Sequence, residues 1–119
     1  MTTKLVSARQ NPAGFLEAIA QPGTGRRGET LASFLQSDVQ GDRATSRALL
    51  DEIAAAERDE KPQPGGVGNA FSIAISPAGA VIRNAVLNGS APEYYTLGEL
   101  RAAIEAWMAA IERASTDPG

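Results

Sequence analysis

The residue types that usually carry enzyme chemistry are scarce in this chain. Its 119 residues include no histidine and no cysteine, which removes the commonest general base and the ligands of most zinc sites. A nucleophilic serine would need a lysine as its base, and neither Lys4 nor Lys61 lies in a recognisable motif. The acidic pairs Asp51–Glu52 and Asp59–Glu60 are adjacent on predicted helical stretches, so their side chains diverge. We predict a protein that is not an enzyme and that holds no metal or cofactor.

One glycine-rich segment could bind phosphate. Residues Gly23–Gly28 match the pattern G-x-G-x-x-G, in which main-chain N–H groups at a helix N-terminus hold a phosphate, here helped by Arg26 and Arg27. No parallel strand–helix–strand unit follows, as a dinucleotide-binding fold requires. We therefore interpret the segment as a flexible connection between a hairpin and a helix. A small nucleotide- or RNA-binding domain that works through the two arginines is retained as an alternative.

Negative charge is concentrated in the second half of the chain. Residues 1–50 carry six basic and four acidic residues, whereas residues 51–119 carry five basic and ten acidic ones. Glu57, Asp59 and Glu60 lie at a predicted helix C-terminus, where the helix dipole disfavours negative charge. This composition argues against direct binding of nucleic acid and favours a basic protein partner.

The only two tyrosines are adjacent, in the segment Pro92-Glu93-Tyr94-Tyr95. We expect one of them in the core and the other exposed, where tyrosine is a frequent interface anchor. Glu93 and Tyr94 are therefore grouped with acids of the predicted helical segment, residues 29–61. The candidate partner-binding residues are Asp51, Glu57, Asp59, Glu60, Glu93 and Tyr94.

The first half of the chain is predicted to form a hairpin followed by helices. The turn NPAG (Asn11–Gly14) separates two short segments of strand-forming residues, so residues 1–28 are assigned to an N-terminal hairpin and a loop. Apolar residues then recur at helical spacing over residues 29–61, with a break at Gly41.

The second half contains the clearest signals. The segment before the turn SPAG (Ser76–Gly79) alternates strictly, with Phe71, Ile73 and Ile75 on one face and Ser72, Ala74 and Ser76 on the other, as in a half-buried strand. A second strand-like segment follows the turn, which predicts a hairpin over residues 69–88. Thr96 and Glu99 form a capping box that begins a helix over residues 96–114, with Trp107 on its apolar stripe. We predict a single domain, residues 1–119, of the α+β class, with about three helices packed on one face of a small antiparallel sheet of hairpins.

The order of these segments resembles a known family, the small immunity proteins of bacterial contact-dependent growth inhibition and related polymorphic toxin systems. The resemblance covers residues 29–113. The positions that carry it are Gly68, Asn69, Phe71, Ser72, Ile73, Ile75, Ile82, Asn84, Tyr95, Leu97, Glu99, Leu100, Ile104 and Trp107.

The resemblance implies a non-catalytic cytoplasmic protein that binds the C-terminal toxin domain of a large exoprotein and blocks its active site. Such a toxin is typically a nuclease, whose phosphate-binding site would suit an acidic partner. The alternative is a cytoplasmic regulatory or structural protein of the same fold without a toxin. No apolar segment of the sequence is as long as the core of a signal peptide or a transmembrane helix, so no membrane contact is expected. The oligomeric state is not predicted.

Overall fold

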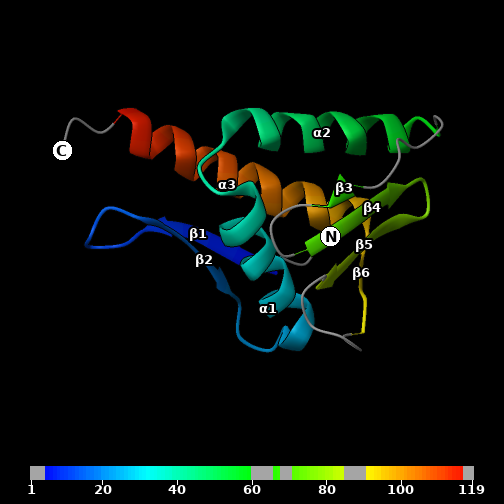
Figure 1. Cartoon of the computed structure of the whole chain (residues 1–119), viewed down its shortest axis with the longest axis horizontal. Helices are drawn as coiled ribbons and strands as arrows, with labels where there is room; N and C mark the ends of the chain where they lie inside the picture. The colour runs from blue at the N-terminus through cyan, green and yellow to red at the C-terminus, as the bar shows by residue number, and fades with distance from the viewer. Residues whose placement is uncertain (1–4, 60–65, 68–70, 85–90, 117–119) are drawn as a thin grey trace.

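The elements of the fold follow the predicted order, with additional short strands. We describe them in a computed structural model, which defines residues 5–59, 66–67, 71–84 and 91–116. In chain order they are β1 (Val6–Gln10), β2 (Leu16–Ala20), α1 (Gly25–Phe34), the π-helical segment η1 (Leu35–Val39), α2 (Arg43–Glu57), β3 (Gly66–Val67), β4 (Phe71–Ser76), β5 (Gly79–Asn84), β6 (Glu93–Tyr95) and α3 (Leu97–Thr116). Figure 1 shows α2 and α3 side by side, with the β1–β2 hairpin projecting at one end.

Both predicted turns close hairpins. At NPAG the Asn11 side chain accepts hydrogen bonds from the N–H groups of Ala13 (3.0 Å) and Phe15 (2.9 Å), and Gly14 adopts a φ of +94°. At SPAG, Ser76 pairs with Gly79 across the end of β4 and β5. The prediction that SPAG is a hairpin turn is confirmed by this pairing.

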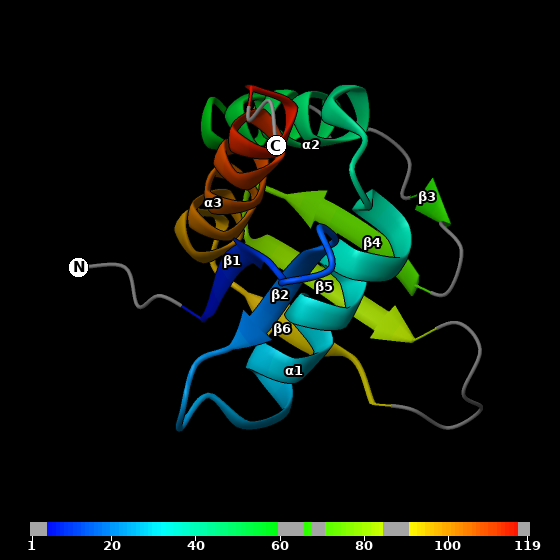
Figure 2. The same cartoon turned by 90° about the vertical axis from the view of Figure 1, so that its left-hand side faces the viewer.

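The strands form two sheets, where we had expected one. β1 and β2 pair as a separate antiparallel ribbon, while β3, β4, β5 and β6 form an antiparallel sheet in that order. The reason is the position of α1, which contacts both β2 and β6 and so lies between the two sheets (Figure 2). The α+β class itself is confirmed, with three helices and antiparallel hairpins.

The four-stranded sheet has one buried face and one open face. Side chains on successive residues of a strand point to opposite faces. The inner face carries buried residues of β4, β5 and β6, which are Phe71, Ile75, Ala80, Ile82 and Tyr95. Between them lie residues of the outer face, among them Ala74, Val81 and Tyr94, which pair across the strands in that order. Among the described elements, the helices therefore cover the inner face and leave the outer face open.

Helix α1 begins at Gly25, four residues earlier than predicted, so the last four residues of the GTGRRG segment (Gly23–Gly28) are helix and not loop. Gly25 has a φ of +60°, which favours glycine. A Cβ on Gly28 would lie 2.0 Å from the Thr24 hydroxyl oxygen and 3.2 Å from the Leu5 carbonyl oxygen. Two of the glycines thus serve the start of the helix and its close packing on the chain before β1.

Helix α3 is the central element of the core. The Thr96 hydroxyl accepts from the Glu99 N–H (3.0 Å) and the Glu99 carboxylate accepts from the Thr96 N–H (2.8 Å), so the predicted capping box is confirmed. The apolar stripe behind it is buried at Leu100, Ile104, Trp107, Met108 and Ile111. None of the helices built from described residues combines the length and the apolar composition that a bilayer crossing needs.

Candidate protein-binding surface

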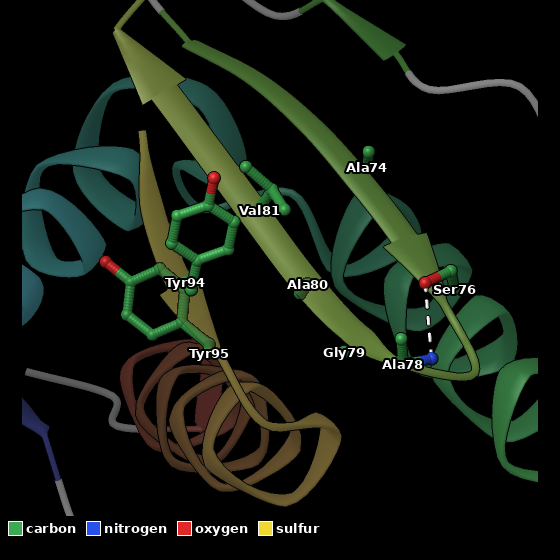
Figure 3. A pocket seen from close by; sticks show the side chains of 8 residues that line it. All are labelled: Ala74, Ser76, Ala78, Gly79, Ala80, Val81, Tyr94 and Tyr95. Carbon is green, nitrogen blue, oxygen red and sulfur yellow. Dashed lines mark hydrogen bonds between the residues drawn. The ribbon is translucent and has the colours of Figure 1, made fainter. Parts of the chain in front are cut away.

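The outer face of the four-stranded sheet carries the most exposed aromatic residue of the second half of the chain. The Tyr94 side chain is 64% exposed, and its pairing partner on β5 is Val81. Figure 3 shows Tyr94 beside Val81, with Ser76 and Ala78 at the β4–β5 turn. These side chains line a shallow depression of about 240 Å³. We call this the outer face; it comprises Ala74, Ser76, Ala78, Val81 and Tyr94.

Tyr95 faces the other way and anchors the strand. Its side chain is 4% exposed, and its hydroxyl donates to the Arg27 carbonyl oxygen of α1 (2.7 Å). Burial raises the pKa of the Tyr95 hydroxyl above its ordinary value, so the hydroxyl stays protonated, and remains a donor, into more alkaline solution than a free tyrosine. The prediction of one core tyrosine and one exposed tyrosine is therefore confirmed.

Arg27 joins α1, β6 and α3 at the edge of the sheet. Its Nε donates to the Tyr94 carbonyl oxygen (3.0 Å), its Nη2 lies 2.5 Å from Glu99 Oε1, and its guanidinium carbon is 5.3 Å from the centre of the Tyr95 ring. Partial burial raises the pKa of Glu99, but the Thr96 N–H and the Arg27 guanidinium outweigh it and hold that pKa below its usual range. Arg27 thus fixes the main chain from which Tyr94 projects.

Glu93 and Arg26 form a second contact between the same elements. The Arg26 Nε lies 3.6 Å from Glu93 Oε1, and the Glu93 side chain is only 16% exposed. Glu93, a predicted partner-binding residue, is thus engaged within the chain and presents little surface to a partner. Both arginines of the GTGRRG segment contact acidic side chains, which weighs against the alternative of a phosphate site built on them.

The predicted acids of α2 lie on the exposed side of that helix and at its end. Asp51 is exposed, and Glu57 forms an ion pair with Arg101 of α3. Asp59 is exposed and has a φ of 59°, in the left-handed conformation that ends many helices. Glu60 lies outside the described residues, as do Gly68 and Asn69 of the family resemblance.

The structure does not bring all the predicted partner-binding residues onto one surface. Tyr94 belongs to the outer face, whereas Asp51 lies on α2 and Asp59 lies just beyond its C-terminal end. Figure 1 shows the C-terminal end of α2 and the β4–β5 turn at the same end of the molecule. Sequence reasoning missed Ala74, Ser76 and Val81 as lining residues, although the alternation that placed Phe71 and Ile75 inside had already placed Ala74 and Ser76 on the opposite face.

Within the described residues, no group of three or more acidic side chains is placed to hold a metal ion. Comparison of the chain with protein-family models, with characterised proteins and with solved structures finds no match. The functional argument therefore rests on the outer face, on the acids of α2 and on the resemblance of the sequence.

Proposed function

We propose that this protein is a binding module that neutralises a protein partner, the C-terminal toxin domain of a contact-dependent growth inhibition system. The toxin is a nuclease with a basic phosphate-binding site. The module performs no catalysis. It binds the toxin domain through the outer face and excludes substrate from the toxin's active site.

The observation that carries the proposal is the exposure of Tyr94 on a sheet face that no described helix covers. Most exposed aromatic side chains that bind partners do so by burying a large, rigid area at little entropic cost. The neighbours of Tyr94 are small, so a partner side chain can enter the depression of about 240 Å³ beside it. Arg27 holds the Tyr94 carbonyl, so the side chain is presented from a fixed main chain.

The charge of the chain supports a basic partner. The net charge is −3, and two of the exposed acids, Asp51 and Asp59, lie on or just beyond α2. Complementary charge raises the rate of association more than it raises the final affinity. The outer face is thus the anchor in this proposal, and the acids of α2 steer the approach of the toxin.

The test is co-expression with the C-terminal toxin domain encoded immediately upstream, followed by affinity capture and a growth assay. A Tyr94→Ala variant is expected to weaken the complex at least tenfold, as for an interface hot spot. The matched control is Phe15→Ala, which removes an aromatic side chain that is 70% exposed at the β1–β2 turn, away from the outer face.

The experiment tests two claims separately: that the protein neutralises the toxin, and that it binds the toxin through the outer face. A stoichiometric complex with rescued growth that Tyr94→Ala leaves unchanged would retain the function and reject the outer face. A wild-type protein that neither binds the toxin domain nor rescues growth would reject the function, and would favour a regulatory or structural role without a toxin.

A further inference from the structure

A second surface lies along the free edge of β2, where the strand borders α1. Figure 2 shows β2 next to α1, on the side away from β1. A groove of about 340 Å³ runs between β2 and the helical stretch formed by α1 and η1. Its lining residues are Ala18, Ala20, Glu29, Ala32, Ser33, Gln36 and Ser37. None of these residues belongs to the outer face, so the groove is a separate site and its function does not depend on the proposed toxin.

The register of the hairpin determines which main-chain groups of β2 point into the groove. The Gln21 N–H donates to the Leu5 carbonyl oxygen and the Asn11 N–H donates to the Phe15 carbonyl oxygen. In an antiparallel pair such hydrogen-bonded positions alternate with non-hydrogen-bonded ones. Residues 17 and 19 therefore bond to β1, while the N–H and C=O groups of residues 16, 18 and 20 point away from it.

One side chain occupies this edge. The Gln36 side-chain oxygen accepts from the Ala18 N–H (2.9 Å), in the place that the carbonyl of a neighbouring strand would take. Within the described residues, no other hydrogen bond reaches the outward main-chain groups of residues 16, 18 and 20. Gln36 is itself exposed, so it can turn into solvent without unpacking the core.

The wall opposite β2 is polar and open. Glu29 and Ser33 of α1 and Gln36 of η1 are all exposed, and they recur at helical spacing along one side of this continuous helical stretch. Within the described residues, Glu29 makes no ion pair. A basic side chain in the groove would meet this carboxylate, while the hydroxyl of Ser33 offers hydrogen bonds to polar neighbours.

We propose that this groove binds an extended peptide segment of a partner protein, which adds to β2 as an antiparallel third strand and places a lysine or arginine against Glu29. The main-chain groups of Ala18 and Ala20 supply the pairing, and Gln36 is displaced by the incoming strand. A two-stranded ribbon is only marginally stable and gains from a third strand. Sheet edges that accept a peptide in this way are a recurrent mode of recognition.

The probe is a phage-displayed library of random linear peptides, selected on the full chain. We expect selected peptides to be rich in lysine or arginine, to shift the amide resonances of Ala18 and Ala20, and to slow their hydrogen exchange. Gln36→Ala removes the competing side chain and is expected to tighten peptide binding about threefold to tenfold, the value of one hydrogen bond. The matched control is Gln10→Ala, whose side-chain amide bonds the Gly14 carbonyl outside the groove.

A second variant blocks the edge without removing a bond to β1. Ala20→Pro deletes only an outward N–H, and proline is tolerated at exposed sheet edges for that reason. It is expected to reduce peptide affinity at least tenfold, with folding checked by circular dichroism. If it does not fold, Gln36→Ala still decides the question.

Three results would overturn the proposal. The first is a selection that yields no binding peptide. The second is a set of peptides whose resonance shifts lie away from β2 and α1, or whose affinity Gln36→Ala does not raise. The third is that Gln36→Ala makes the chain self-associate in analytical ultracentrifugation without peptide, which would assign the edge to a second copy.

Discussion

At the scale of single residues, Trp107 is the largest fully buried side chain among the described residues. Its side chain is 1% exposed, and its indole N–H donates to the Gln40 carbonyl oxygen (2.6 Å). Gln40 follows the π-helical segment η1 and has a φ of 55° and a ψ of −148°, a conformation rare outside glycine. The local strain at Gln40 thus accompanies a carbonyl that satisfies the one polar atom of the buried tryptophan side chain.

We predict that Trp107→Ala lowers the free energy of unfolding by about 3–5 kcal/mol, because it leaves a large cavity and an unpaired carbonyl. Urea unfolding followed by circular dichroism measures the loss. A loss below about 1 kcal/mol, as for a surface substitution, would contradict the central position of α3 in the core.

A second prediction concerns Glu99. The pKa of Glu99 in the folded protein is held below the ordinary glutamate value. Its charged form therefore stabilises the fold fully at pH values above the ordinary pKa. This contribution is lost as the pH falls through the lower pKa of the folded state. We expect the stability of the wild type to fall between about pH 5 and pH 3. Glu99→Gln should be less stable at neutral pH and should lose less on acidification. Parallel slopes for the two proteins in thermal melts would reject this role.

At the scale of elements, the β4–β5 hairpin depends on a close approach to β6. Gly79 has a φ of +139°, and a Cβ added there would lie 2.7 Å from the Tyr95 carbonyl oxygen. The glycine of SPAG therefore serves two purposes: it allows the turn, and it lets β6 pack closely against β5. The glycine of NPAG has only the first, because the nearest atom to its added Cβ is 3.9 Å away, at the end of the Gln10 side chain.

This difference between two nearly identical turns yields a prediction. Gly79→Ala is expected to lower stability by about 2–3 kcal/mol, since it adds a main-chain clash to the cost of positive φ. Gly14→Ala should cost only about 1 kcal/mol, from the backbone conformation alone. Urea unfolding of both variants compares them directly, and equal losses would mean that β6 moves away at no cost.

At the scale of the whole molecule, the exposed Phe15 lies apart from the outer face and from the acids of α2. Phe15 lies at the turn of the projecting β1–β2 hairpin, while the C-terminal end of α2 and the β4–β5 turn lie at the opposite end (Figure 1). Glu57 is bound to Arg101 and holds α2 to α3, so it is a poor probe of partner charge. Asp59 is a better one, because asparagine also tolerates its left-handed conformation.

We predict that Asp59→Asn slows association with the toxin domain about twofold to threefold at low salt, and that the difference disappears at high salt. Stopped-flow kinetics measures the rate constant. Glu29→Gln removes the same charge from α1 and serves as the control. An equal effect of the two variants would show that net charge matters, and not its position near α2.

Local signals in the sequence were sufficient to predict several features. Both turns, the capping box of Thr96 and Glu99, and the apolar stripe through Trp107 follow from residues three or four apart, because turns and helix ends are satisfied by near neighbours. The alternation in β4 also predicted which of its residues are buried. The α+β class follows from the order of these segments.

Only the tertiary structure decided the features that join distant segments. The interactions of Arg27 with Tyr94 and Glu99 and of Gln36 with Ala18 span 67, 72 and 18 residues. Such contacts depend on where α1 lies between the two sheets, which no local pattern in GTGRRG specifies. The same placement leaves the Tyr94 side chain exposed, leaves the Glu93 side chain mostly buried, and leaves the edge of β2 without a neighbouring strand. Local sequence patterns reflect the hydrogen bonds and burial that each segment requires by itself. Which side chains stay exposed depends on how all the segments pack together.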